Sequence, residues 1–234
     1  MRTITVDEFK RVLQDIPNNP RVLASGNFAT PKTLLEAFDS VVPNYTLHML
    51  NAQKGIPDRE GVKYETAFVG PGMRNSPRLD YVPSRLSLLP VLVRDHLIPD
   101  IVLIHTSQRR FDTVSLGTEV NILPAAIETV RARGGIVVAQ SNKQMPYTYG
   151  DAQIYENEID FLIEVDEPLT EHHPQHLTPT AKAIGEKIAE LVKDQSTLQM
   201  GIGAVPDAVL ELLQKRSGLR IWTEMFSDGV LNLH

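Results

Sequence analysis

Short apolar runs, each bounded by polar residues, glycine or proline, recur through the middle of the chain. Three of them, at 101–104, 136–139 and 161–165, are nearly continuous rather than alternating. Strands buried on both faces show such runs, whereas strands with one exposed face alternate apolar and polar residues. Between the first two runs, apolar residues recur at helical spacing over 123–130 and a Gly-Gly pair follows. This order predicts a strand–helix–strand unit with parallel strands.

Two helix starts are predicted near the beginning of the chain. Thr5 and Glu8 have the spacing of a capping box, in which each side chain accepts from a backbone amide of the first turn. This pattern predicts a helix over 6–15. Thr30 and Pro31 predict a second start, with Thr30 as the N-cap and Pro31 as the first helical residue.

The same alternation continues towards the C-terminus. Thr178 followed by proline predicts a helix start, and a strand is expected near 197–200. A further helix, with Pro206 in its first position, leads to a strand over 219–222. Strands alternating with helices predict an α/β fold, with a largely parallel sheet and helices on both faces.

The length and composition agree with a globular α/β protein. The 234 residues can hold one large domain or one and a half smaller ones. We expect a first domain over 1–194 and the beginning of a second over 195–234, because a polar stretch at 194–196 separates two strand–helix segments. Apolar residues make up 42% and charged residues 22%, which are ordinary values for a chain that folds around a core.

Charge and cysteine content exclude several classes of function. The formal net charge is −6 and the basic residues are scattered, so nucleic acid is not an expected partner. With 0 cysteines, disulfides, thiolate metal sites and cysteine nucleophiles are excluded. No apolar signal region or membrane-length run of about 18 apolar residues is found, so we expect a cytoplasmic protein with no membrane span.

The stretch 197–206 combines a strand, two glycines one residue apart and a helix start. Gly201 and Gly203 allow a ligand to approach the backbone, and free amides at the helix start face it. A phosphate, a carboxylate or a thioester oxyanion would suit this turn, and a tight turn without ligand is the alternative. A dinucleotide fingerprint is disfavoured because Pro206 stands where that motif needs its third glycine.

Three other strand ends carry candidate chemistry. Gly26 lies in a strand-to-helix turn, and Asn142, Met145 and Pro146 directly follow a predicted buried strand. Because parallel sheets bind ligands outside the carboxyl ends of their strands, these residues are candidate site residues, and a solvated loop is the alternative. Glu224, just past another strand, is the best candidate in the chain for a carboxylate nucleophile; capping of the next helix by its neighbours explains the segment equally well.

Histidines suggest two weaker hypotheses. His172, His173 and His176 invite a metal site, although no matching acid stands at helical spacing and a surface loop is the simpler interpretation. We therefore expect no metal. His105 follows a predicted strand and suits either an acid/base group or a hydrogen-bonded structural histidine.

Taken together, several segments resemble the acetyl-CoA hydrolase/transferase family, which includes 4-hydroxybutyrate and other carboxylate CoA-transferases. The matching segments stand in family order and span nearly the whole chain: SGNFATPKTLLEAF, RLDYVPSRLSLLP, VSLGTEV, QSNKQMPYTYGD, EIDFLIEVDEPL, TLQMGIGAVPDAVL and WTEMFSDG. The chain departs from the family pattern at two places. One is the arginine pair at 109–110, and the other is Trp222, a position at which the family commonly has histidine.

The resemblance implies a CoA-transferase-like (Rossmann-like) fold in two domains, with the active site between them. In that family a glutamate attacks the acyl-CoA, so coenzyme A is substrate and covalent intermediate, and an acyl-CoA and a small carboxylate are the partners. We expect the catalytic glutamate beyond residue 234, so no residue of this chain is assigned as catalytic and the chain alone should be inactive. Carried over as pocket wall or backbone donors are Gly26, Asn142, Met145, Pro146, Gly201 and Gly203, with Glu224 in an uncertain role.

The resemblance leaves the assembly of the protein open. A homo-oligomer is expected, or a separate second-domain partner if the protein is naturally split. A binding or partner module that has kept this fold without the chemistry is the alternative function.

Overall fold

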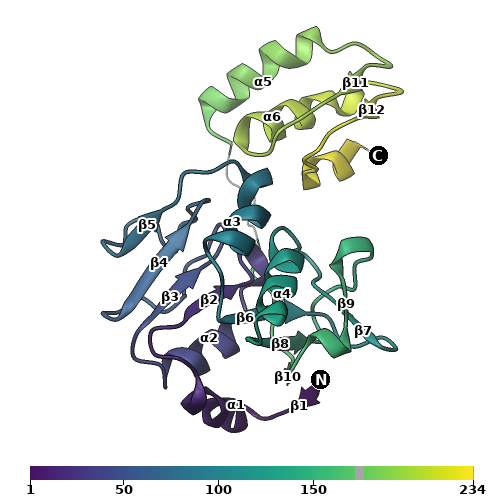
Figure 1. Cartoon of the computed structure of the whole chain (residues 1–234). Coiled ribbons are helices and arrows are strands. Elements are labelled where there is room, and N and C mark those ends of the chain that lie inside the picture. Colours follow the sequence, from purple (N-terminus) through teal and green to yellow (C-terminus); the bar gives the residue numbers. More distant parts are fainter. Residues whose placement is uncertain (172–176, 234) are drawn as a thin grey trace. The chain divides into compact units, whose positions relative to one another are not determined.

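The computed structural model describes residues 1–171 and 177–233 (Figure 1). The chain forms two compact units, Met1–Glu171 and His172–His234. The first is built around one large sheet, and the second contains a small sheet and two helices. Each unit is described by itself.

The first unit is organised by an eight-stranded sheet in which every neighbouring pair is parallel. The order of strands across the sheet is β1-β10-β8-β6-β2-β3-β4-β5. The bounds are β1 Arg2–Thr3, β2 Arg21–Ala24, β3 Tyr45–His48, β4 Val62–Thr66, β5 Leu79–Tyr81, β6 Ile101–Thr106, β8 Ile136–Asn142 and β10 Phe161–Val165. Two further strands, β7 Thr113–Ser115 and β9 Gln153–Tyr155, pair antiparallel beside it.

Helices cover both faces of this sheet, so the predicted α/β fold is confirmed (Figure 1). The helices α1 Val6–Val12 and α2 Lys32–Asp39 pack on one face, and α3 Leu89–Asp95 and α4 Leu123–Ala132 pack on the other. Successive residues of the central strands alternate between the two hydrophobic cores. This double burial is the physical reason why the strand sequences are almost continuously apolar.

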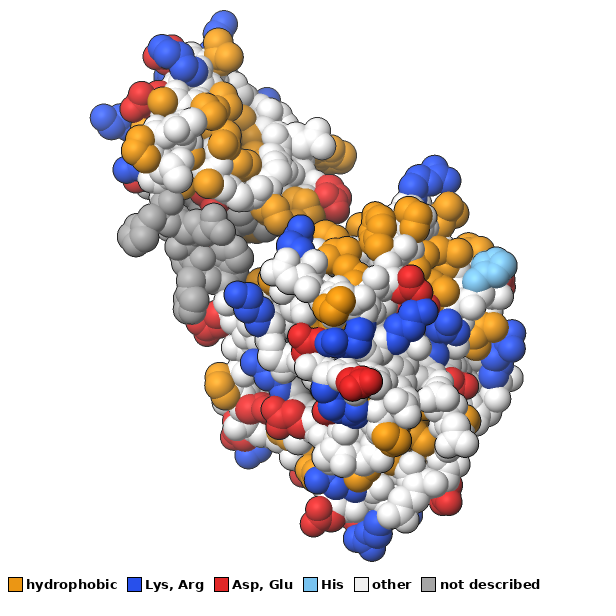
Figure 2. All heavy atoms as spheres, turned by 90° about the vertical axis from the view of Figure 1, so that its left-hand side faces the viewer, with side chains coloured by type: hydrophobic (Ala, Val, Ile, Leu, Met, Phe, Trp, Pro, Cys, Tyr) orange, Lys and Arg blue, Asp and Glu red, His pale blue; other side chains and the backbone are white. Residues whose placement is uncertain are grey.

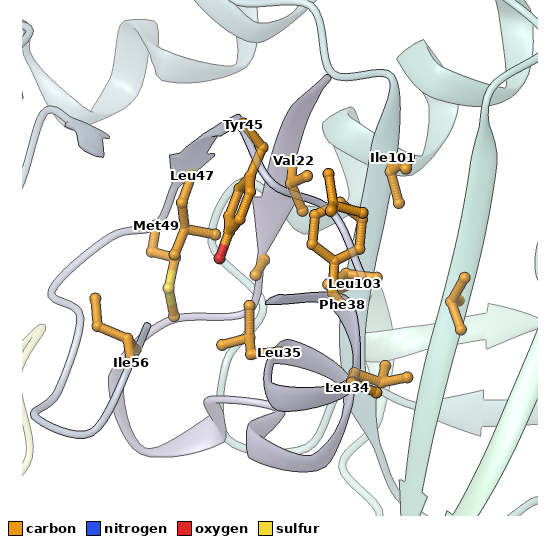
Figure 3. Packing of buried hydrophobic residues seen from close by; sticks show 14 of the residues in the cluster. Val22, Leu34, Leu35, Phe38, Tyr45, Leu47, Met49, Ile56, Ile101 and Leu103 are labelled. Carbon is orange, nitrogen blue, oxygen red and sulfur yellow. The ribbon is translucent and has the colours of Figure 1, made fainter. Parts of the chain in front are cut away.

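The core on the α1/α2 face is close-packed around aromatic and branched side chains (Figure 3). Leu35 and Phe38 project from α2 towards Leu47 and Val22 of the sheet, and Leu34 of the same helix belongs to the same core. All five side chains have at most 1% of their surface exposed. Each such side chain contributes on the order of 2 kcal/mol by leaving water.

Most sequence-based elements of the first unit are confirmed, with corrections at helix ends. The Thr5 capping box with Glu8 is present. The α-helix ends at Val12, earlier than predicted, and a 3₁₀ turn over Leu13–Asp15 follows it. The predicted cap at Thr30 is wrong, because its hydroxyl donates to the Asn27 carbonyl and Pro31 occupies the N-cap position.

The second unit repeats the strand–helix alternation on a smaller scale. Its elements are α5 Pro179–Leu191, β11 Thr197–Leu198, α6 Ala204–Leu212 and β12 Arg220–Ile221, the strands being parallel neighbours. Thr178 caps α5 as predicted, accepting from the Ala181 amide. Pro206 is the third residue of α6 rather than its first, because the helix already begins at Ala204, next to the Gly203 N-cap.

The two helices of this unit pack closely at a glycine. A Cβ added to Gly185 of α5 would lie 3.0 Å from the Cβ of Ala208 on α6. The polar stretch at 194–196, predicted as a domain boundary, lies within this compact unit, where the Gln195 amide donates to the Ser217 carbonyl. The compact units divide after Glu171, and the domain boundary after residue 194 stays a prediction.

Hydrophobic side chains gather on the surface of the second unit (Figure 2). On α5 alone, Ile184, Ile188 and Leu191 are exposed. Within the described part of the chain, no helix combines the length and apolar character needed to cross a membrane.

Candidate functional site

The carboxyl ends of the parallel strands in the first unit lie along one edge of the sheet. Parallel sheets bind ligands at this edge, because the loops that leave the strands carry backbone and side-chain donors there. Register brings β2, β6 and β8 together at this edge, with Ala24 beside Leu103 and Thr106 beside Ser141. Gly26, Met145 and Pro146 lie in the loops after β2 and β8, and Asn142 is the last residue of β8.

Gly26 lies in the first turn after β2, where two loops approach closely. A Cβ added to Gly26 would lie 1.9 Å from the carbonyl oxygen of Leu50, in the loop after β3. The Asn27 amide donates to the same carbonyl at 3.2 Å. Gly26 is buried, so its absent side chain permits contact between loops, and it does not offer an open backbone surface.

Next to Gly26, asparagine side chains surround a buried carboxylate. The Nδ2 of Asn27 donates to Oε2 of Glu119 at 2.5 Å, and the Nδ2 of Asn121 donates to Oε1 at 2.7 Å. The Nδ2 of Asn51 in turn donates to Oδ1 of Asn27. The network therefore links the loops that follow β2, β3 and β7.

The three asparagines share an unusual backbone conformation. Asn27, Asn51 and Asn121 have φ angles of 44°, 46° and 30°, in the left-handed region that asparagine tolerates better than most residues. Burial raises the pKa of Glu119 above its ordinary value of 4.5, against the lowering effect of the Asn27 and Asn121 hydrogen bonds. Backbone strain and a perturbed carboxyl group at a ligand-binding edge are features of functional sites.

A second polar cluster caps α2 from across the sheet. The Oε1 of Gln140 on β8 accepts from the Leu34 amide at 3.1 Å, while its Nε2 donates to Oε1 of Glu167 at 2.7 Å. Thr33 also donates to Glu167, at 2.9 Å. A Gln140 carboxamide thus replaces the cap that the sequence assigned to Thr30.

His105 on β6 borders this cluster. Its Nε2 lies 3.5 Å from Nε2 of Gln140, and its Nδ1 has no hydrogen-bond partner among the described residues. Only 3% of the residue is exposed, and burial lowers its pKa to about 4. A neutral, enclosed imidazole agrees with the structural interpretation of this histidine better than with an acid/base group working near neutral pH.

The predicted site residues at the end of β8 and in the loop after it have different environments. The carboxamide of Asn142 is fully buried and bridges to Glu167, donating to its carbonyl at 2.8 Å and accepting from its amide at 3.2 Å. Met145 is buried, and a Cβ on Gly117 would lie 2.2 Å from its sulfur. Pro146 is exposed. Asn142 and Met145 therefore shape the edge, while Pro146 lies at its surface.

In the second unit, the structure brings the glycine turn beside the loop that contains Glu224. The hydroxyl of Thr223 donates to the Met200 carbonyl at 2.8 Å and accepts from its amide at 3.2 Å. Gly201 and Gly203 are exposed, with no atom within 4 Å of an added Cβ. Glu224 is also exposed. The turn and the carboxylate thus share the carboxyl edge of β11 and β12.

Gly203 alone of this group requires glycine. Its φ of 114° lies in a region that residues with side chains rarely adopt, and it stands at the N-cap of α6. The turn is therefore exposed, and only its Gly203 position requires glycine for the backbone conformation.

Metal binding finds no support in the described residues. Over 1–171 and 177–233, no group of three or more histidine and carboxylate side chains is arranged to hold a metal ion. The candidate ligands His172, His173 and His176 lie outside the described residues.

The fold is that of an α/β protein whose candidate site residues lie at the carboxyl ends of parallel strands, and comparison with known proteins identifies its family. The chain is 35% identical over 237 residues to 4-hydroxybutyrate coenzyme A transferase from Clostridium kluyveri, covering 96% of this chain and 54% of that protein. It is 36% identical over 241 residues to a succinyl-CoA:acetate/propanoyl-CoA:succinate CoA transferase from Fasciola hepatica, covering 97% and 49%. No protein-family model matches the chain.

Solved structures agree with this comparison. A 4-hydroxybutyrate CoA-transferase from Porphyromonas gingivalis superimposes with a TM-score of 0.75 at 29% identity, over 99% of this chain and 56% of that one. RipA from Yersinia pestis, at 23% identity and a TM-score of 0.82 over 99% of this chain and 58% of that one, shares the fold.

The chain therefore belongs to the family of these CoA-transferases, as its motifs predicted. It spans about half the length of the curated relatives it matches.

Proposed function

We propose that this chain forms part of an acyl-CoA:carboxylate CoA-transferase. The observation that carries the proposal is the similarity to CoA-transferases over 96% of the chain. The exposed glycine turn at Gly201–Gly203 supports it, because backbone amides at such a turn suit a thioester oxyanion. An acyl-CoA and a small carboxylate would be the substrates.

The reaction would run through a covalent CoA intermediate. A glutamate carboxylate attacks the thioester carbonyl and CoA leaves as the thiolate, which gives a mixed anhydride. The thiolate then attacks the glutamyl carbonyl, releasing the donor acid and leaving a glutamyl-CoA thioester. Attack of the acceptor carboxylate on that thioester reverses these steps and yields the new acyl-CoA. Exclusion of water protects the anhydride from hydrolysis.

Two positions for this glutamate are proposed, and they lead to different expectations for the activity of residues 1–234 alone. The family resemblance leads us to expect it beyond residue 234, which would leave this chain alone inactive. The contact between Thr223 and Met200 favours Glu224 as the alternative, because it holds this exposed carboxylate beside the Gly201 turn. A carboxylate nucleophile needs such a neighbouring set of donors for the oxyanion that it creates.

Trapping the covalent intermediate would decide between them. The longest reading frame that contains residues 1–234 is incubated with acyl-CoA and then reduced with borohydride, which converts a glutamyl thioester to an alcohol. Peptide mass spectrometry then locates the modified residue. If it lies beyond residue 234, residues 1–234 alone show no CoA transfer and Glu224→Gln retains activity; if it is Glu224, that variant loses about three orders of magnitude or more. Glu211→Gln, at an exposed position of α6, is the matched control.

A non-catalytic binding or partner module with this fold is the second candidate. Binding of acyl-CoA without a trapped thioester or CoA transfer in the longest reading frame would support it. The cytoplasmic location and the homo-oligomeric or split assembly stay predictions.

A further inference from the structure

A tight turn with an unusual residue at its tip follows β6 at the carboxyl edge of the first sheet. The Arg110 amide donates to the Thr113 carbonyl at 2.8 Å, and the Thr113 amide donates back to the Arg110 carbonyl at 3.1 Å. Between them stands Phe111, with a φ of 56°. Two-residue turns with positive φ favour glycine, asparagine or aspartate, and a bulky aromatic residue there is a conformational outlier.

Packing does not explain the phenylalanine. Phe111 is 98% exposed, so it buries almost no apolar surface within this unit. A strained backbone that carries a fully exposed aromatic ring points to a contact outside the chain.

The neighbouring Arg110 contacts two aromatic residues. Its guanidinium carbon lies 4.7 Å from the ring centroid of Tyr147, and its Nη1 donates to the hydroxyl of Tyr149 at 3.3 Å. The Tyr147 hydroxyl is fixed in turn, 2.6 Å from Oγ1 of Thr113 and 3.1 Å from Nε2 of Gln153. The tyrosines come from the loop after β8, so two neighbouring strand ends position one guanidinium.

Charge pairing distinguishes Arg110 from the adjacent arginine. Arg109 forms an ion pair with Glu156, Nη1 to Oε2, at 2.9 Å. Among the described residues, Arg110 takes part in no ion pair. A preorganised guanidinium without a counter-ion is suited to bind an anion such as phosphate with two parallel hydrogen bonds.

We propose that this turn binds the adenosine 3′-phosphate end of the CoA thioester. Arg110 pairs with the phosphate, and the exposed rings of Phe111 and Tyr149, the latter 71% exposed, stack on the adenine. The site rests on the proposed function for its ligand, because CoA combines an adenine ring and a terminal phosphate monoester in one molecule.

Direct titration tests the site without depending on transferase activity. Adenosine 3′,5′-bisphosphate is titrated into residues 1–234 by calorimetry, with adenosine 5′-monophosphate as the ligand that lacks the 3′-phosphate. We expect Arg110→Gln to weaken binding of the bisphosphate at least tenfold and of the monophosphate less than threefold. Arg109→Gln is the matched control and should change the bisphosphate affinity less than threefold. Equal affinity of the wild type and Arg110→Gln for the bisphosphate overturns the proposal.

Phe111→Gly separates a ligand contact from a structural role. Glycine relieves the positive φ, so the melting temperature should stay the same or rise while bisphosphate affinity falls about fivefold. A fall in melting temperature with unchanged affinity contradicts the proposal. If Arg110→Gln does not fold, Arg110→Lys takes its place; it keeps the charge without the planar fork and should weaken binding at least threefold, and unchanged affinity again contradicts the site.

Steady-state kinetics of the protein encoded by the longest reading frame add an independent readout. Arg110→Gln should raise KM for acyl-CoA while kcat and KM for the carboxylate stay within twofold, because the adenosine end lies far from the reacting thioester. A fall in kcat with unchanged KM overturns the assignment. If the frame shows no transfer at all, the proposed function fails, and the bisphosphate titration still decides the binding site.

Discussion

The carboxamide of Asn27 lies 2.5 Å from the buried carboxylate of Glu119, although the two residues are 92 positions apart in the chain. This contact joins the loop after β2 to the loop after β7 at the candidate ligand-binding edge. A buried carboxylate without its donors loses several kcal/mol of solvation, so the asparagines make its burial tolerable.

Asn27→Asp should destabilise the protein by about 2 kcal/mol at neutral pH, because it places a second carboxylate beside Glu119. The deficit should shrink as the pH falls through the raised pKa of the buried carboxyl pair, where one carboxyl takes up a proton and donates to the other. Urea denaturation at several pH values measures this. Asn19→Asp is the control, because Asn19 is exposed and shares the left-handed conformation, with a φ of 53°. A deficit equal to that of the control would contradict the role of Glu119.

His105 should make stability depend on pH between about 4 and 6.5. Burial depresses its pKa in the folded state, so the unfolded chain binds more protons in this window and folding is favoured as the pH rises. The contribution is complete above 6.5, is lost as the pH falls towards 4, and amounts to about 3 kcal/mol at most. His105→Gln should flatten the dependence, whereas His96→Gln, at an exposed position, should leave it unchanged. Thermal melts across this range provide the measurement.

Replacement by alanine should affect stability very differently at two glycines of the predicted site. Gly26→Ala places a methyl group against the Leu50 carbonyl and should cost about 3 kcal/mol of stability. Gly201→Ala meets no neighbouring atom and should change stability by less than about 0.5 kcal/mol. If the Gly201 turn contacts the thioester as proposed, its variant should still lower kcat/KM of the longest reading frame. Paired denaturation and kinetic assays separate the two effects.

The core in Figure 3 should be far less tolerant than the surface of α5. Leu47→Ala removes a fully buried side chain and should cost about 2–5 kcal/mol in chemical denaturation. Leu191→Ala, where the leucine is 80% exposed, should cost less than about 0.5 kcal/mol in residues 1–234. A similar cost for both would indicate that another molecule buries Leu191 under the conditions of the measurement.

The sequence by itself determined the elements, the α/β class and the family. Apolar runs at 101–104 and 136–139 gave strands because burial on both faces demands apolar residues at every position. The capping box and the motifs are likewise local, since the residues that form each of them lie within a few positions of each other. Positions such as Gly201 and Asn142 were therefore located on the correct strand ends.

Only the tertiary structure decided what those positions contact. Gln140 caps α2 from 106 positions away in the chain. Gly26 is required by the Leu50 carbonyl, and Glu119 is held by asparagines from separate loops. Such contacts depend on the order and register of parallel strands, which bring distant residues to one edge and leave no periodic signal in the sequence.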